Sequence, residues 1–134
     1  MTLNELYRDC ENNHIEVYPF KMKSSMKGIA LPSGDIGLDL DKIEDSMEEK
    51  EVLAHEESHI LGGYFYTIDS PLTVKGKQER RAVVLTIKKL IPRDELIQAI
   101  RSGLTEHWEL AEYFEVSCKF MLQAMEYYGS SILH

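Results

Sequence analysis

His55-Glu56-Glu57-Ser58-His59 lies in an apolar, proline-free run with helical spacing. Two histidines four residues apart are separated by about 40° around a helix, so both imidazoles share one face and can bind one metal ion. The glutamate after the first histidine is then placed to activate a water molecule on the metal. The motif predicts a metal centre on a helix. The alternative is a solvated helix face that carries two histidines by chance.

Signals for the start and the end of a helix flank this motif. Ser46 lies three residues before Glu49, which is the spacing of a capping box. Gly62-Gly63 follows the last apolar residues and is a typical helix end. We therefore predict a helix over residues 46–62, and this context favours the metal centre over a chance match.

Length, composition and charge limit the class of protein. The 134 residues suffice for one compact domain, and a hydrophobic content of 43% is ordinary for a globular core. A net charge of −8 repels phosphate backbones, which argues against direct binding to nucleic acid. Cys10 and Cys118 have no metal-ligand spacing, and reduced thiols are the simplest interpretation. We expect neither a signal peptide nor a membrane span, and therefore a cytoplasmic protein.

The N-terminal third is predicted to form a helix and a small sheet. Apolar residues at helical spacing predict a helix over residues 2–12. Alternating polarity predicts a strand over residues 14–18, and two further strands are expected over residues 28–31 and 36–40. Turn residues at 32–35 join the last two strands into a hairpin. A small antiparallel sheet should therefore precede the motif helix.

The chain after the motif helix is predicted to be helical. Ser70-Pro71 is a start signal and Pro92 a break, which together predict a long helix over residues 73–90. A shorter helix is expected over residues 93–101, closed by Ser102-Gly103.

Two last helices carry the C-terminal apolar residues. Thr105 is expected to cap the first, in which Trp108 is a core residue, and Ser117 to cap the second. The pair is similar to part of a helix-turn-helix, but its second helix offers only Lys119 and Gln123 for reading DNA. A packed helical hairpin that covers the core is the expected role.

A catalytic zinc needs a third protein ligand. Glu79 follows His59 by 20 residues, a gap that suits a loop and the first turns of an antiparallel helix. An acidic residue on a mostly apolar helix face needs a partner, and a metal ion would be one. The alternative is that Glu79 is a surface residue beside the two arginines that follow it. Asp69 and His107 are weaker candidates.

Three aromatic residues, Tyr64-Phe65-Tyr66, follow the motif helix. Tyr66 is a candidate catalytic residue, because a phenol can donate a hydrogen bond to an oxyanion. The alternative is that the three rings are simply buried.

At this point the chain resembles a known family. The motif, together with Glu79-Arg80-Arg81-Ala82 and Lys89-Leu90-Ile91-Pro92, is similar to the ImmA/IrrE metallopeptidases. The likeness extends over nearly the whole chain and is greatest to short members found in phages and integrative elements of Gram-positive bacteria. The resemblance implies a zincin-like α+β fold and a protein partner, a helix-turn-helix repressor encoded nearby, which is cleaved or removed.

The resemblance also implies the ligand set, with Zn²⁺ on His55, His59 and Glu79. Glu56 would then be the general base of peptide hydrolysis. The alternative is a non-hydrolytic antirepressor that binds its partner and uses zinc only for structure. A DNA-binding regulator is a weaker third hypothesis.

We expect one α+β unit in two parts. Residues 1–92 form the zincin-like core, with the small antiparallel sheet and the motif helix, and residues 93–134 form a helical subdomain packed on it. No feature of the sequence predicts an oligomeric state.

The sequence departs from the family pattern at Val83. In many zinc peptidases of this type, a carboxylate one turn after the glutamate ligand orients a histidine. Another acceptor would have to replace it, such as Asp39, Asp69 or a backbone carbonyl. Without one the site is weakened, because loss of such a partner costs about 10–100-fold in metal affinity or activity.

Overall fold

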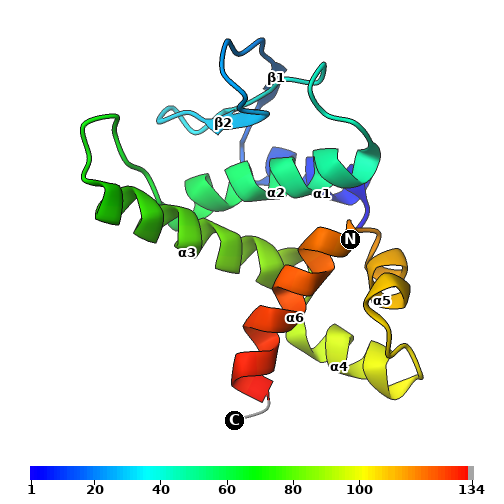
Figure 1. Cartoon of the computed structure of the whole chain (residues 1–134). Helices are drawn as coiled ribbons and strands as arrows, with labels where there is room; N and C mark the ends of the chain where they lie inside the picture. Colours follow the sequence, from blue (N-terminus) through cyan, green and yellow to red (C-terminus); the bar gives the residue numbers. More distant parts are fainter. Residues whose placement is uncertain (133–134) are drawn as a thin grey trace.

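The computed structural model describes residues 1–132, with side chains up to residue 129, and has the expected α+β fold (Figure 1). The helices are α1 (Leu3–Asn12), α2 (Ser46–Gly62), α3 (Leu72–Leu90), α4 (Arg93–Arg101), α5 (His107–Phe114) and α6 (Cys118–Ile132). The strands are β1 (Val17–Pro19), β2 (Gly28–Ala30) and β3 (Ile36–Leu38). All the predicted helices are therefore present in the described range.

The sheet is mixed, so the prediction of an antiparallel sheet was wrong in one of its two pairings. β3 lies in the centre, antiparallel to β2 and parallel to β1. Parallel strands need a long crossover, and residues 20–35 supply it between β1 and β3. β1 is also shorter than expected, because His14 has a φ of 60°, in the left-handed region that strands do not use. The predicted hairpin of β2 and β3 is confirmed.

The motif helix α2 has the predicted length, with one change at its start. Asp45, not Ser46, is the N-cap, and its carboxylate accepts a hydrogen bond of 2.8 Å from the Glu48 N–H. The backbone of Asp45 is extended, with a φ of −149°, as an N-cap requires, so Ser46 becomes the first helical residue. Gly63 ends the helix with a φ of 66°, as the predicted glycine stop requires.

Caps of the later helices also differ from the prediction. Glu106, not Thr105, precedes α5, and its N–H donates to the side chain of the glutamate three residues on. Ser70 does not cap α3, because its hydroxyl accepts from the Thr67 N–H within the loop. Ser117 does cap α6, since its Oγ accepts from a first-turn N–H at 3.1 Å.

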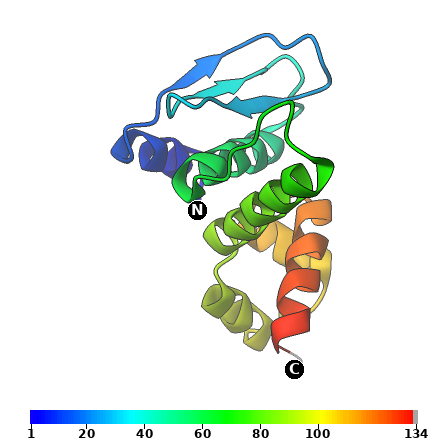
Figure 2. The same ribbon diagram turned by 90° about the vertical axis from the view of Figure 1, so that its left-hand side faces the viewer.

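The elements stack in layers around α2. Figures 1 and 2 show the sheet over one side of α1 and α2, with α3 and the C-terminal helices on the other side. One apolar cluster runs through these layers and includes Leu6 of α1, Leu53 of α2, Leu90 of α3 and Leu110 of α5. The division at residue 92 stays a prediction.

Trp108 was wrongly predicted to be in the core. Its side chain is 55% exposed, in the first turn of α5 beside the ring of His107. The buried face of this helix starts two residues later, with Leu110, Ala111 and Phe114. The first turn of this short amphipathic helix is not covered by the neighbouring layer, so the Trp108 side chain stays exposed.

Two further expectations concern chemistry outside the core. Cys10 is buried and Cys118 is exposed, and both are free thiols, as predicted. Within residues 1–132, no helix combines the length and the apolar character that crossing a membrane requires.

Candidate metal centre

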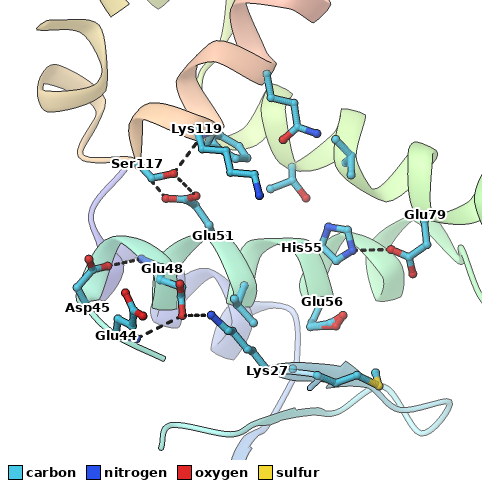
Figure 3. Close-up of a pocket in the computed structure, with 17 residues that line it drawn as sticks. Lys27, Glu44, Asp45, Glu48, Glu51, His55, Glu56, Glu79, Ser117 and Lys119 are labelled. Carbon is cyan, nitrogen blue, oxygen red and sulfur yellow. Dashed lines mark hydrogen bonds and ion pairs between the residues drawn. The ribbon is translucent and has the colours of Figure 1, made fainter. Parts of the chain in front are cut away.

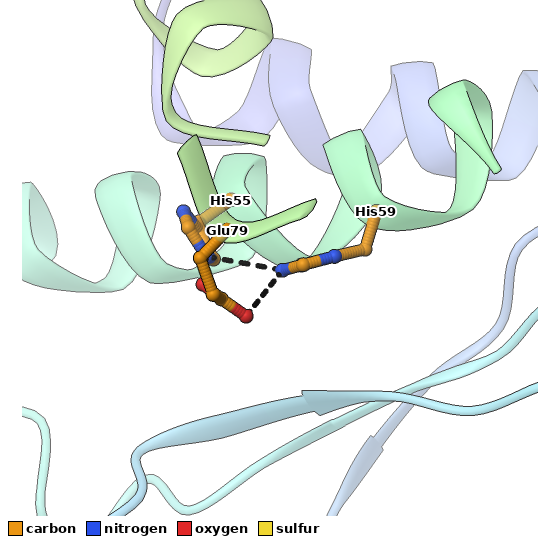
Figure 4. Close-up of side chains that lie close together, drawn as sticks. All are labelled: His55, His59 and Glu79. Atoms are coloured by element: carbon orange, nitrogen blue, oxygen red, sulfur yellow. Dashed lines mark hydrogen bonds and ion pairs between the residues drawn. The ribbon is translucent and has the colours of Figure 1, made fainter. Parts of the chain in front are cut away.

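His55 and His59 project from one face of α2 and meet Glu79 of α3 (Figure 4). Nε2 of His55 lies 3.2 Å from Nε2 of His59 and 2.9 Å from Oε2 of Glu79. Oε1 of Glu79 lies 3.0 Å from Nε2 of His59. Donor atoms of three side chains from two helices therefore lie close together.

The spacing of these atoms fits a tetrahedral metal ion. Bonds of about 2.0–2.1 Å to imidazole and carboxylate place neighbouring ligand atoms about 3.3 Å apart. The two imidazole nitrogens and the carboxylate oxygens all carry lone pairs, and few protons are available for hydrogen bonds between them. A single cation would satisfy all three side chains at once. Of the residues that the structure describes, only these three form such a group.

Antiparallel packing of α2 and α3 places Glu79. Ala82, Thr86 and Leu90 follow it along α3 and are buried against the core. The Thr86 hydroxyl lies 3.0 Å from that of Ser58, a buried residue of the motif, which fixes the register between the helices. The apolar face predicted from the sequence is therefore what carries Glu79 to the histidines.

The electrostatics favour the protonation states of metal ligands. Burial lowers the pKa of His55, which favours the neutral imidazole that binds metals. Burial alone would raise the pKa of Glu79, but hydrogen bonds from Tyr66 and His55 and the nearby His59 lower it below its usual value. Glu79 is therefore an ionised carboxylate.

Glu56 lies beside this cluster without belonging to it. Its side chain is buried, with 8% exposure, and Oε2 has no hydrogen-bond partner among the described residues. Burial raises its pKa to about 7; the charge of His59 opposes this shift and that of Glu79 adds to it. A carboxylate that exchanges a proton near neutral pH and has a free oxygen suits general base catalysis.

A backbone carbonyl orients His59. Nδ1 of His59 lies 2.6 Å from the carbonyl oxygen of Tyr64, and a ring that donates from Nδ1 keeps Nε2 free for a metal. This carbonyl is one of the acceptors considered in place of an acid at Val83. Asp39 is engaged elsewhere, where its carboxylate accepts from the Met22 N–H at 3.0 Å.

Tyr66 lies at the cluster. Its side chain is exposed, so the alternative that the three rings are simply buried is wrong for this residue. Its hydroxyl donates a 2.8 Å hydrogen bond to Oε1 of Glu79, and its ring centre lies 6.4 Å from that of His59. Partial removal from solvent and the hydrogen bond to Glu79 raise the pKa of Tyr66 to about 12, so the phenol keeps its proton. Its role in catalysis stays a prediction.

The structure does not bring the weaker candidates to this site. Neither Asp69 nor His107 belongs to the group of ligand atoms found among the described residues. Asp69 is an exposed residue of the loop before α3, and the ring of His107 packs on Trp108 at 5.2 Å.

One set of contacts was missed by the sequence analysis. Glu57 of the motif is fully buried and forms an ion pair with Lys89 of α3, which also binds Asp9 of α1. The Cys10 thiol donates to Glu57 at 3.4 Å. This network ties three helices together behind the metal cluster. The only signal for this network in the sequence was that each of the three helices carries a charged residue on its apolar side.

A cleft of about 640 Å³ opens from the cluster (Figure 3). It follows α2 back toward the start of the helix, past Val52 and Glu48. β2 packs closely against α2 on one side of the cleft. A Cβ atom added at Gly28 would lie only 2.7 Å from a methyl group of Val52. Val83 lines the same cleft. The cleft therefore gives access from solvent to His55 and Glu56 along α2.

Comparison with known proteins adds one finding. A peptidase family model, described as the IrrE N-terminal-like domain, matches residues 35–126. The match runs from the hairpin turn before β3 into α6 and includes the three cluster residues and Glu56. No curated protein and no solved structure matches the chain.

Proposed function

Because the chain belongs to the peptidase family of the IrrE N-terminal-like domain, we propose that it is a zinc-dependent endopeptidase that cleaves a helix-turn-helix repressor of a phage or mobile element. The family match covers well over half of the 134 residues and agrees with the resemblance seen in the sequence. The observation that carries the proposal is the convergence of His55, His59 and Glu79 beside Glu56.

The residues divide the chemistry between them. His55, His59 and Glu79 would hold Zn²⁺, and the bound ion supplies a Lewis acid for a water molecule and the scissile carbonyl. Glu56 accepts the proton of the attacking water and returns it to the leaving amine, a role that its pKa near 7 suits. Tyr66 would donate a hydrogen bond to the developing oxyanion once its hydroxyl turns from Glu79, to which it donates in the free protein.

The net charge of the chain agrees with a DNA-binding repressor as its protein partner. The net charge of −8 complements a basic DNA-binding protein and repels its DNA. A repressor of this type acts on the chromosome in the cytoplasm, which is where we place the activity. Cleavage would separate its DNA-binding part from the rest and release the repressed genes.

Coexpression with the neighbouring repressor tests the proposal. The wild-type chain should produce repressor fragments on a gel, whereas Glu56→Gln should retain metal and bind the repressor in a pull-down without cutting it. Loss of a general base costs about 10²–10⁴-fold in rate. Glu95→Gln, the same change at an exposed site on α4, is the matched control and should cleave normally.

The alternative that Val83 raises is an antirepressor that sequesters its partner around a structural metal. A valine cannot accept the hydrogen bond that an acid at this position would receive. If Glu56→Gln relieves repression as well as the wild type and no fragment forms, sequestration replaces proteolysis as the function.

A further inference from the structure

The helical pair α5 and α6 is anchored to the motif helix one turn before His55. Lys50 of α2 is 2% exposed, and its Nζ donates to the carbonyl of Phe114 at 2.8 Å. The next residue, Glu51, accepts from the Ser117 N–H at 2.9 Å and from its hydroxyl at 2.8 Å. The start of α6 is therefore held at a defined position over α2.

This anchoring makes α6 a wall of the cleft. Lys119, Phe120 and Gln123 line the same cavity as His55 and Glu56. Lys119 and Gln123 are four residues apart, so their side chains share one face of α6. They are also the two side chains that the helix-turn-helix-like pattern would offer to DNA.

Of the two lysines among the described residues that line the cleft, Lys27 is paired within the chain and Lys119 is available to a ligand. Asp45 caps α2, Glu48 pairs with Lys27 at 2.8 Å, and Glu51 binds Ser117, so these three carboxylates have partners in the chain. Lys119, by contrast, has no ion pair among the described side chains. Figure 3 shows its side chain reaching from α6 toward the space between Glu51 and His55.

We propose that Lys119 and Gln123 form a substrate subsite that binds an aspartate or glutamate side chain of the peptide. The ammonium and the amide NH₂ group both donate to a carboxylate. Because both side chains line the same cleft as His55 and Glu56, a peptide bound at the metal cluster can reach them with a neighbouring side chain. This inference rests on the proposed peptidase function.

Duplex DNA is the competing ligand for these side chains. The cleft also presents Glu44, Asp45, Glu48 and Glu51, which would repel a phosphate backbone. A peptide with a single carboxylate can place it at Lys119 and keep the rest of its chain near these acids. The surroundings therefore favour the peptide.

Cleavage profiling tests the subsite. The zinc-loaded full chain is incubated with a peptide library derived from a bacterial proteome, and the cut sites are identified by mass spectrometry. The wild type should select Asp or Glu at one position, and Lys119→Glu should reduce that selection about tenfold, as loss of a charged hydrogen bond predicts. Gln123→Ala should have a smaller effect in the same direction.

Matched variants separate the subsite from net charge. Lys88→Glu and Gln98→Ala make the same changes at exposed positions outside the cleft and should keep the wild-type profile. Zinc content and thermal stability should be equal in all variants. An identical profile for Lys119→Glu and the wild type would overturn the subsite.

A binding arm distinguishes failure of the subsite from failure of the peptidase. Immobilised Glu56→Gln is exposed to the same library, and the retained peptides are compared with those held by Glu56→Gln/Lys119→Glu. If the wild type cuts nothing but acidic peptides are retained only with Lys119, the peptidase proposal fails and the subsite stands. If neither cutting nor retention depends on Lys119, the subsite fails.

A DNA arm completes the test. Mixed-sequence 30-base-pair duplexes are titrated with the wild type and Lys119→Glu at low salt. No shift is expected for either protein. A shift that requires Lys119 would assign this face to nucleic acid and overturn the proposal.

Discussion

The carbonyl oxygen of Tyr64 lies 2.6 Å from Nδ1 of His59, five residues earlier in the chain. The Tyr64 N–H in turn donates to the His59 carbonyl at 2.9 Å, so the turn that ends α2 also orients the second histidine. A backbone acceptor replaces the carboxylate that Val83 cannot supply. The orientation of this histidine therefore depends on the geometry of the glycine turn and not on one acidic side chain.

Strain in that turn should weaken metal binding. Gly63 has a φ of 66°, and a β-branched residue is disfavoured there, so Gly63→Val should shift the Tyr64 carbonyl and lower zinc affinity about tenfold. Competition with a chromophoric chelator measures the affinity. Gly34→Val is the control, because Gly34 has a φ of 95° in the distant hairpin turn. Both variants should lose stability, but equal zinc affinities would show that the carbonyl is not important.

Removing a ligand should remove the metal. We expect about one zinc per chain in the wild type, and His55→Ala or His59→Ala should lose it, because each removes one donor of the cluster. Glu79→Gln should keep the fold but bind zinc more weakly, since the amide is uncharged. Metal analysis after dialysis measures the content. Zinc lost from Asp69→Asn or His107→Ala but retained by Glu79→Gln would mean a different third ligand.

The ionisation of Glu56 should lower the stability of the metal-free protein as pH rises. The pKa of Glu56 changes from 4.5 in the unfolded chain to about 7 in the fold, so the folded state holds the extra proton between these values. The free energy of unfolding should decrease across this interval by up to about 3 kcal/mol from this group and stay low above it. Below pH 4.5 this loss of stability vanishes, because Glu56 is protonated in both the folded and the unfolded state.

Glu56→Gln isolates this contribution. Urea denaturation with a chelator present, near pH 5 and near pH 8, should show a smaller loss of stability for this variant than for the wild type. The metal-free variant should also be the more stable protein near pH 8, since it buries no unpaired carboxylate. Glu95→Gln should behave as the wild type. Equal pH dependence in all three proteins would contradict a buried, unpartnered Glu56.

The link between α2 and α6 should contribute to stability. Ser117→Ala removes the hydroxyl that caps α6 and donates to Glu51, and should cost about 1–2 kcal/mol. Urea denaturation of the zinc-loaded protein measures this loss. Ser33→Ala, in the exposed hairpin turn, should change the stability much less. A loss no larger than that of the control would mean that the contact does not anchor α6.

The sequence by itself determined the elements whose causes are local. Helical periodicity placed His55 and His59 on one face of a helix, and Gly62-Gly63 marked its end, because both depend only on residues within a few positions. The hairpin of β2 and β3 followed from its turn residues in the same way. Glu79 was identified as a candidate by its place on an apolar face, but its alternatives stayed open at that level.

Only the tertiary structure decided what depends on distant segments coming together. The packing of α3 on α2 selected Glu79 over Asp69 and His107 as the residue that meets the histidines, and the long crossover made the sheet mixed. The anchoring of α6 turned Lys119 toward the cleft. Such contacts join residues far apart in the chain, and their geometry is set by packing of whole helices, which no local pattern encodes.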